Sequence, residues 1–463
     1  MRVLLVNPPF TIYGGLEGQG GKSAPLNLAY LSSYLKQHKP YYQIKIIDAE
    51  NLRLDYDLLD AEIREFNPDI LGITMPTPAF EQAMEVVRRA KWMNHNVKTI
   101  VGGPHPTAFP KEVSRETFID FVVYGEGEKS FYNLCDAIEY NKLYNSIQGI
   151  AYSGIINPPQ PLIDNLDEIP FPARDLLPME TYYAPPTKRE TIKKNANIIS
   201  SRGCPYNCTY CMAKTVWGRK TRFRSVKNVV DEIQHCVDVY GIGEFNFNDE
   251  LFTCNRQRTI EFCQEVMNRD LDISFVCSLR VNHVWKDVLG WLKIAGCKKV
   301  MFGFESGSQL ILDNIKKGAT LKQAEEAVAL VKRFGIKTSG AFMIGNIGET
   351  EETIRETIDF SKKLNVDTVS FYVASPYPGT EFYEQAKPYF RPNVTWSDFA
   401  LIGTNPLLDL PNLSHEKIAY WYKRAYREYY LRIDFIRERL RNIKSWIDIK
   451  NIIDGLGILK ALH

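Results

Sequence analysis

The sequence of 463 residues lacks the features of a protein that crosses or enters a membrane. It has no run of about 18 apolar residues, the length that a transmembrane helix requires. Its amino terminus has only a short apolar stretch before Pro8 and Pro9, too little for the core of a signal peptide. We therefore expect a cytoplasmic protein without a transmembrane segment.

An excess of charge of one sign is also missing. The 57 Lys and Arg residues nearly balance the 55 Asp and Glu residues, leaving a net charge of +2. Because nucleic-acid-binding proteins usually carry a clear positive excess, we expect no nucleic-acid partner. Apolar residues at 44% and charged residues at 24% are typical of a globular protein, and the length allows two or three domains.

A framework of disulfides is absent as well. The nine cysteines are an odd number, and outside one loop they are scattered without the spacing of metal ligands. This usage indicates a reducing compartment. We expect ordinary core or surface thiols at Cys236, Cys254, Cys263, Cys277 and Cys297.

Three other cysteines, Cys204, Cys208 and Cys211, lie together in the spacing C-x3-C-x2-C. Cysteine thiolates are the usual ligands of a [4Fe–4S] cluster, and three of them leave one iron free for a small molecule. A structural zinc site would need a fourth ligand, but His235 and Cys236 lie well beyond the loop. A zinc knuckle or free thiols remain the alternatives.

The run from Ser201 to Cys211 closely resembles the cluster loop of the radical S-adenosylmethionine (radical SAM) enzymes, including the aromatic Tyr210. In that family the free iron chelates SAM, and an electron from the cluster cleaves SAM to a 5′-deoxyadenosyl radical. The resemblance implies a cluster on the three cysteines, a SAM contact at Tyr210 and an external electron donor of the flavodoxin or ferredoxin type.

Residues 1–140 alternate Val-, Ile- and Leu-rich runs with segments of helical periodicity. This alternation predicts a doubly wound, flavodoxin- or Rossmann-like α/β domain that binds its ligand beyond the carboxyl ends of parallel strands. The expected strands are Val3–Val6, Ile44–Ile47, Ile70–Thr74, Thr99–Val101 and Phe121–Val123, and the expected helices are Leu26–Gln37, Asp57–Phe66 and Phe80–Met93.

Glycines and polar residues collect at these strand ends. The runs Gly102–His105 and Gly125–Glu128 resemble the cobalamin (B12)-binding domain that precedes many radical SAM domains, although a generic flavodoxin-like domain would show similar glycines. The resemblance implies cobalamin contacts at Pro8, Gly14, Gly15, Thr74, Thr77, Gly102, Gly103, His105, Tyr124, Gly125 and Glu126.

One departure from the cobalamin pattern concerns the cobalt ligand. Domains that ligate cobalt through histidine carry Asp-x-His-x-x-Gly after the first strand, where this sequence has Asn7-Pro8-Pro9-Phe10. We therefore predict cobalt without a lower histidine ligand. His105 would contact the nucleotide tail or be a satisfied loop histidine.

The segment Gly15–Ser23 resembles a phosphate-binding P-loop, G-x-x-x-x-G-K-[ST]. Counting back five residues from Gly21 reaches Leu16, so the register fails by one. We expect a mobile glycine-rich lid rather than an NTPase site.

Residues 141–190 are rich in proline and predict a linker. Residues 191–385 again alternate strands and helices, and six such units resemble the incomplete TIM-type barrel of the radical SAM superfamily. The expected strands are Ala196–Ser200, Phe245–Asn248, Phe275–Leu279, Val300–Phe304, Ser339–Ile344 and Thr368–Val373. The expected helices are Val226–Tyr240, Arg256–Asn268, Val284–Ile294, Leu321–Phe334 and Glu349–Lys363.

Polar residues follow these strands, and the resemblance to radical SAM enzymes implies that they contact SAM. Asp249 or Glu250 would take the SAM ammonium, and Arg280 is a fixed cation suited to its carboxylate. Glu305 and Ser306 would meet the ribose or amine, and the turn at Gly345 resembles the family's adenine-contacting turn.

Residues 386–463 predict a helical C-terminal domain with interleaved basic and aromatic residues, as in Tyr420–Tyr430. Such a helix could close the open barrel, pack with a solvated basic face, or make peripheral contact with a membrane.

Taken together, the resemblance implies a cobalamin-dependent radical SAM methyltransferase acting on an unactivated carbon of a small-molecule or peptide substrate. One SAM would methylate cobalt, and a second would generate the radical. The alternative is oxidative cyclisation, ring contraction or rearrangement without methyl transfer. A non-enzymatic cobalamin or iron–sulfur carrier is the remaining hypothesis.

Overall fold

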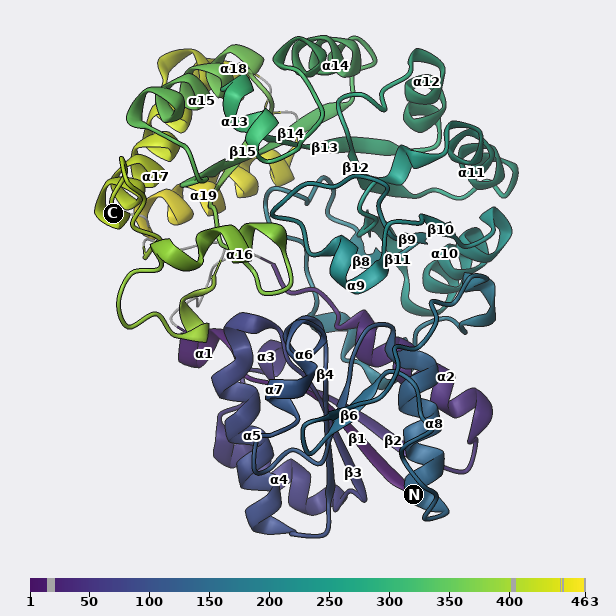
Figure 1. Cartoon of the computed structure of the whole chain (residues 1–463). Coiled ribbons are helices and arrows are strands. Elements are labelled where there is room, and N and C mark those ends of the chain that lie inside the picture. The colour runs from purple at the N-terminus through teal and green to yellow at the C-terminus, as the bar shows by residue number, and fades with distance from the viewer. Residues whose placement is uncertain (15–20, 401–404, 442, 444, 462–463) are drawn as a thin grey trace.

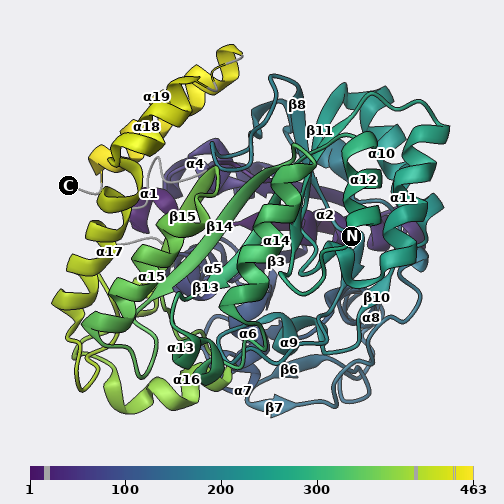
Figure 2. The same cartoon turned by 90° about the horizontal axis from the view of Figure 1, so that it is seen from above.

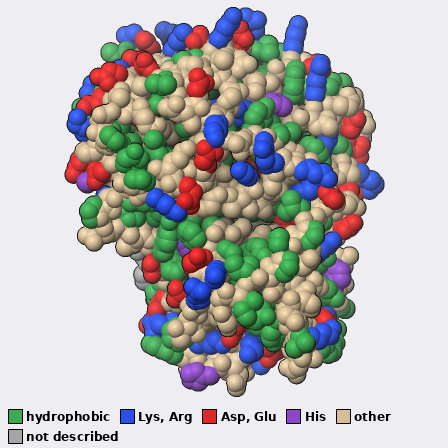
Figure 3. All heavy atoms as spheres, in the orientation of Figure 1, with side chains coloured by type: hydrophobic (Ala, Val, Ile, Leu, Met, Phe, Trp, Pro, Cys, Tyr) green, Lys and Arg blue, Asp and Glu red, His purple; other side chains and the backbone are tan. Residues whose placement is uncertain are grey.

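The computed structural model describes residues 1–14, 21–400, 405–441, 443 and 445–461. Two α/β units follow one another along the chain, and C-terminal helices flank the second (Figure 1). In Figure 1 the first unit, purple to blue, lies below the teal and green second unit. Figure 3 shows basic and acidic side chains interspersed over the face of the molecule seen in Figure 1, in keeping with the nearly balanced charge of the sequence.

Within the described residues, the first unit is built on a seven-stranded sheet in the order β2-β1-β3-β4-β5-β6-β7. Its first five strands are parallel, and β3 and β5 are buried along their whole length because nearly all their residues are apolar. This confirms the doubly wound fold. The parallel strands are β1 (Arg2–Asn7), β2 (Gln43–Asp48), β3 (Ile70–Thr74), β4 (Lys98–Gly102) and β5 (Phe121–Val123).

The sheet continues past residue 140, where the sequence places the start of the linker. β6 (Ile150–Tyr152) pairs antiparallel with β5, and β7 (Ile155–Ile156) pairs with β6. The two strands form a hairpin around Ser153 and Gly154, both in the left-handed region at φ 49° and 77°. Strands this short carry too little periodicity for the sequence to predict them.

Helices cover both faces of this sheet. On one face α2 (Leu26–His38) and α8 (Gly127–Glu139) pack their apolar sides, and on the other α4 (Tyr56–Phe66) and α5 (Phe80–Met93) do so. Four short helices lie in the connections: α1 (Thr11–Gly14), α3 (Ala49–Leu52), α6 (Pro104–Ala108) and α7 (Pro110–Val113).

The second unit is an open half-barrel. Among the described residues its sheet has six parallel strands in the order β15-β14-β13-β12-β11-β8, and β15 and β8 do not pair with each other. This confirms the partial TIM-type barrel. The strands are β8 (Lys194–Ile198), β11 (Ile242–Phe247), β12 (Ser274–Leu279), β13 (Cys297–Glu305), β14 (Lys337–Ile344) and β15 (Thr368–Val373).

The helices of the half-barrel line its outer face (Figure 2). Alternate strand residues such as Phe245, Phe275 and Phe342 pack outward against them, so the other residues of each strand face the interior. The helices are α10 (Val226–Tyr240), α11 (Arg256–Asn268), α12 (Lys286–Ile294), α13 (Gln309–Asn314), α14 (Leu321–Arg333) and α15 (Glu351–Leu364).

Between the units the chain forms the short 3-10 turns Leu166–Glu168, Arg174–Leu176 and Met179–Thr181. Arg174 is buried there, and its guanidinium donates to Glu232 of α10 at 2.8 Å and to the carbonyl of Asn197 in β8 at 2.8 Å. The connection is therefore packed against the barrel through a buried ion pair.

The C-terminal residues form α16 (Glu381–Ala386), α17 (His415–Tyr430), α18 (Ile433–Arg441) and α19 (Trp446–Ala461). The hydroxyl of Tyr430 accepts from the N–H of Val369 at 2.9 Å and donates to its carbonyl at 2.6 Å. Tyr426 does the same with Phe371, at 3.1 and 3.0 Å. Tyrosine hydroxyls thus take the place of a neighbouring strand along the free edge of β15.

Of the three interpretations of this segment, these contacts support closure of the barrel edge. Over the part of the chain that the structure describes, every helix is too short or too polar to cross a membrane.

We predict that Tyr430→Phe lowers the free energy of unfolding by about 1–3 kcal/mol, because it leaves a buried N–H and C=O of β15 without partners. Urea unfolding measures the change. Tyr420→Phe on the same helix is the control, since Tyr420 is 55% exposed and its loss should cost less than about 0.5 kcal/mol. Equal effects of the two substitutions would contradict the edge-closing role.

Candidate active site

The cluster loop, residues 203–221, leaves and re-enters the half-barrel through a two-stranded neck. The neck consists of β9 (Ser201–Arg202) and β10 (Arg222–Phe223), which pair antiparallel. The loop is fixed to the barrel by its backbone, since the N–H of Thr209 donates to the carbonyl of Ile315 at 3.0 Å. It also contains the short helix α9 (Ala213–Trp217).

The three cysteines of the loop are free, half-buried thiols. Burial, together with the thiols of Cys208 and Cys204, raises the pKa of Cys211 to about 11. Among the described residues, the one group of potential ligands whose atoms all lie within 4.8 Å of one another is elsewhere, at Asp409, His415 and Glu416.

The donor set of the loop fits an iron–sulfur cluster. Cysteine thiolates are the usual ligands of a [4Fe–4S] cluster, and the loop supplies three of them. A structural zinc site takes four ligands, one more than residues 203–221 supply.

Arg280, which follows β12, lies directly beside the loop. Its guanidinium stacks over the ring of Tyr206, 3.6 Å from the ring centroid, and Nη1 lies 3.8 Å from the sulfur of Cys208. Its Nε and Nη2 are buried without a hydrogen-bond partner. A buried guanidinium with two free donors is suited to a carboxylate ligand, as the sequence predicts for SAM.

The two candidate ammonium ligands after β11 are engaged to different degrees. The Oδ1 of Asp249 accepts hydrogen bonds from the N–H of Ser200 at 3.0 Å and the hydroxyl of Ser201 at 2.5 Å, so this carboxylate holds the strand ends together, while its buried Oδ2 has no partner. Glu250 also has a buried Oε2 without a partner, and burial raises its pKa to about 7. Each carboxylate therefore keeps one oxygen for a cationic ligand, and Glu250 is the one that does not hold the strand ends.

The residues after β13 are partly committed to the protein. Glu305 stands at φ 68°, and its Oε1 accepts from the hydroxyl of Tyr210 at 2.9 Å and from Lys317 at 2.8 Å. Ser306 is fully buried, with its hydroxyl 3.0 Å from that of Thr357. Glu305 thus joins the loop aromatic to the barrel, and the hydroxyl of Ser306 lies against that of Thr357, so its contact with a ligand stays a prediction.

The turn after β14 is held by a buried carboxylate. Gly345 has φ 97°, and its N–H and that of Asn346 donate to Glu349 at 2.5 and 2.8 Å. Burial raises the pKa of Glu349 to about 7. The side-chain amide of Asn346 is buried with both polar atoms unpartnered, and this ligand candidate was not predicted from the sequence.

The predicted cobalamin contacts gather at one edge of the first unit, at the carboxyl ends of its parallel strands. Gly103 is required there, because its φ is 108° and a Cβ would lie 3.2 Å from the backbone N of Met75. Gly15 lies outside the described residues, as does most of the predicted lid. The residues at this edge are Pro8, Gly14, Thr74, Thr77, Gly102, Gly103, His105, Tyr124, Gly125 and Glu126.

Glycines at this edge would let a large flat ligand come close to the backbone. Gly125 has φ 75°, and a Cβ there would meet nothing within 4 Å, so the turn after β5 borders open space. This edge therefore suits a cobalamin because its backbone is accessible, and not because charged side chains would contact the ligand.

His105 is enclosed at this edge. Its Nδ1 lies 3.3 Å from the hydroxyl of Thr77, and its ring centroid is 4.8 Å from those of Phe80 and Trp396. Burial lowers its pKa to about 4, so the imidazole is neutral. Of the two interpretations from the sequence, these contacts agree with a loop histidine that bonds to the protein.

Two predicted cobalamin contacts direct their side chains elsewhere. The hydroxyl of Tyr124 donates to the carbonyl of Asn157. The carboxylate of Glu126 is 3.1 Å from Arg202 and 2.8 Å from Arg222, in the neck of the cluster loop. The sequence could not show these partners, because they lie far along the chain.

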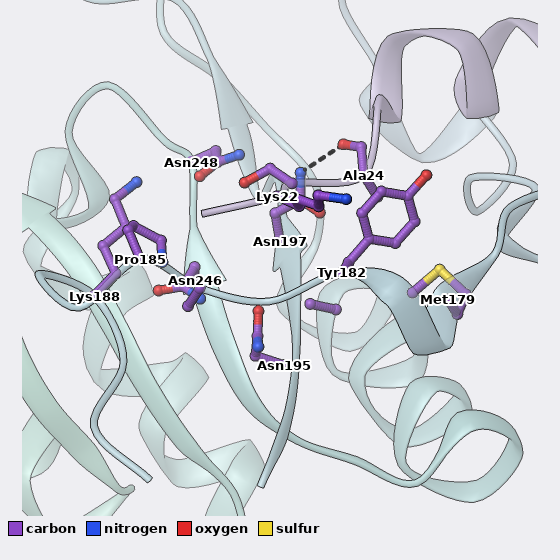
Figure 4. Close-up of a pocket in the computed structure, with 13 residues that line it drawn as sticks. Lys22, Ala24, Met179, Tyr182, Pro185, Lys188, Asn195, Asn197, Asn246 and Asn248 are labelled. Carbon is purple, nitrogen blue, oxygen red and sulfur yellow. Dashed lines mark hydrogen bonds between the residues drawn. The ribbon is translucent and has the colours of Figure 1, made fainter. Parts of the chain in front are cut away.

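A polar pocket lies inside the half-barrel (Figure 4). Asn195 and Asn197 of β8 and Asn246 and Asn248 at the end of β11 line it, since these positions alternate with the outward apolar ones. Lys188 reaches the same pocket. Burial lowers the pKa of Lys188, and no ion pair of its ammonium with a described residue is found.

This pocket was missed from the sequence. The alternation of asparagine with apolar residues along two neighbouring strands is a signal that could have revealed it.

Comparison with known families supports the geometry. Residues 198–361 match the model of the radical SAM superfamily, and residues 19–135 match that of the B12 binding domain. The two matches correspond to the half-barrel with its cluster loop and to the doubly wound unit.

Two relatives are similar over most of the chain. An uncharacterized methyltransferase of Pyrococcus horikoshii is 38% identical over 462 residues, covering 98% of both chains. An anaerobic magnesium-protoporphyrin IX monomethyl ester cyclase of Rubrivivax gelatinosus is 34% identical, covering 83% of this chain and 70% of the relative.

Among solved structures, the radical S-adenosylmethionine methyltransferase TsrM of Kitasatospora setae, with cobalamin and a [4Fe-4S] cluster bound, has the same fold. Its TM-score is 0.70 at 19% identity, covering 91% of this chain and 85% of that chain. The chain therefore belongs to the radical SAM superfamily, in the group whose members carry a B12-binding domain before the radical SAM domain.

Proposed function

We propose that this protein is a cobalamin-dependent radical SAM methyltransferase that methylates an unactivated carbon. The proposal rests on one observation. The edge of the first unit that carries the predicted cobalamin contacts lies against the cluster loop of the half-barrel. Helix α6, at the ligand edge of the first unit, contacts α9 of the cluster loop. The similarity over full length to a methyltransferase of Pyrococcus horikoshii supports the reaction type.

The residues of the loop region suit the amino-acid end of SAM. Arg280 offers two free donors to the carboxylate, and Glu250 offers a free oxygen to the ammonium. Both groups are largely buried, so water competes weakly for them. With its cofactors bound, the enzyme has an electron source that cleaves SAM and a carrier that delivers a methyl group to a carbon without a nucleophilic electron pair.

A second candidate is ring formation or rearrangement without methyl transfer. The 34% identity to a magnesium-protoporphyrin IX monomethyl ester cyclase favours it. In both cases we propose an external electron donor of the flavodoxin or ferredoxin type, a cytoplasmic setting and a small-molecule or peptide substrate.

Turnover products distinguish these functions. We expect the protein, reconstituted without oxygen with iron, sulfide, cobalamin, SAM and a reductant, to form both S-adenosylhomocysteine and 5′-deoxyadenosine with a methyl gain on its substrate. Mass spectrometry over tetrapyrroles, polycyclic lipids, peptides and antibiotic precursors measures this. Cys208→Ser, which removes one cluster ligand, should abolish 5′-deoxyadenosine.

The other outcomes are equally clear. Formation of 5′-deoxyadenosine without S-adenosylhomocysteine would support ring formation or rearrangement. Failure to consume SAM at all, with the cluster assembled, would contradict both enzymatic functions and favour a carrier.

The polar pocket is tested through the stability of the protein. We predict that Lys188→Met raises the free energy of unfolding at pH 7 by at most about 1 kcal/mol, because burial lowers the pKa of this half-buried ammonium and no ion pair offsets the cost among the described residues.

The pH dependence has a definite sign. The pKa of Lys188 is lowered in the folded protein, so the cost is fully present below the folded pKa and disappears as pH rises through the unfolded value of about 10.4. Urea unfolding at pH 7 and 10 should show the gain shrinking. The exposed Lys111→Met is the control. Destabilisation by Lys188→Met at pH 7 would contradict the prediction.

A further inference from the structure

The neck of the cluster loop carries two positive charges side by side. Arg202 in β9 and Arg222 in β10 are directly opposite each other in the antiparallel pair. They are only 4% and 3% exposed. Like charges at opposite positions of a strand pair repel each other, and burial removes the water that would screen them. The neck on which all three cysteines depend is therefore unstable by itself.

The missing counter-charges come from the first unit. Glu126, just before α8, bridges both arginines, with Oε1 3.1 Å from Nη1 of Arg202 and Oε2 2.8 Å from Nη1 of Arg222. Glu128 adds a second contact to Arg202 at 2.6 Å. The two carboxylates are 2% and 5% exposed, so two positive and two negative charges are buried together.

Neighbouring groups complete this cluster of charges. The N–H of Ile163, in the connection between the units, donates to Glu126 at 2.8 Å, and its carbonyl accepts from Arg222 at 2.6 Å. The Arg202 guanidinium also lies 4.7 Å from the ring centroid of Trp217 in α9. Burial acts to raise the pKa of Glu126, but the arginines and the Ile163 N–H outweigh it, so the carboxylate is ionised.

We propose that Glu126 and Glu128 are positioning residues that clamp the neck of the cluster loop from the B12-binding domain. Residues 203–221 then take the conformation that binds a cluster only while this domain is docked. The proposal rests on the cluster site of the proposed function. It assigns Glu126 a role different from the cobalamin contact that its motif suggests.

The clamp is tested with Glu126→Gln, which keeps the size of the side chain and removes its charge. After oxygen-free reconstitution we expect iron per chain to fall at least threefold. In the protein without iron, trypsin should cleave within residues 203–221 at least threefold faster. Cobalamin affinity, from absorbance titration, should stay unchanged.

A matched control lies at the far end of α8. Glu139→Gln removes a carboxylate that pairs with Lys39 at 3.0 Å within the first unit, and it should alter neither iron content nor loop cleavage. Adding Arg222→Gln to Glu126→Gln removes one charge of each sign and should restore iron binding in part. Glu128→Gln, which leaves Glu126 bridging both arginines, should give a smaller loss and serves if Glu126→Gln does not fold.

Two results would overturn the clamp. One is wild-type iron content and loop cleavage in Glu126→Gln. The other is weakened cobalamin binding with an intact loop, which would make Glu126 a cofactor contact instead. If the wild-type protein binds no iron, the proposed function fails, and loop cleavage in the iron-free protein still decides whether the clamp exists.

Discussion

The constraint on which this structure depends is the burial of charge between its two units. Arginines and glutamates meet where the first unit, the connecting segment and the half-barrel come together, in the pairs Arg202–Glu126, Arg222–Glu126, Arg202–Glu128, Arg174–Glu232 and Arg224–Glu232. Removing one partner of such a pair leaves a buried charge uncompensated, which typically costs about 3–5 kcal/mol. The units are therefore held in one mutual orientation, in which α6 at the strand-end edge of the first meets the cluster loop of the second.

The same orientation determines how the half-barrel is enclosed. At one side, tyrosine hydroxyls of α17 satisfy the free edge of β15. At the other, the side-chain amide of Asn197 in β8 donates to the carbonyl of Ala24, and Lys22 pairs with Tyr183. Three parts of the chain thus wall a polar interior that includes Asn246 and Lys188. A half-barrel needs such covering because its two edge strands expose unpaired backbone groups.

The sequence was sufficient for most of the fold. Helices Phe80–Met93, Val226–Tyr240 and Arg256–Asn268 begin and end where predicted, because strong periodicity and local caps such as Ser225 define them. Side-chain direction was not predictable in the same way. Asp249, Ser306 and Glu126 stand at the expected strand ends, yet their polar atoms bind protein groups that the local pattern does not reveal.

Hydrogen bonding shows which groups beside the strand ends are fully used by the protein and which keep a free atom. Both carboxylate oxygens of Glu126 are paired with the arginines of the loop neck. Asp249 holds strand ends through Oδ1 but leaves Oδ2 unpartnered, and Arg280 and Glu250 also keep buried polar atoms without a partner. Leaving such atoms unpaired costs about 1–3 kcal/mol each, so folding alone gives no reason to retain them. A guanidinium and carboxylates with free atoms match a zwitterionic ligand, and binding it would recover that energy.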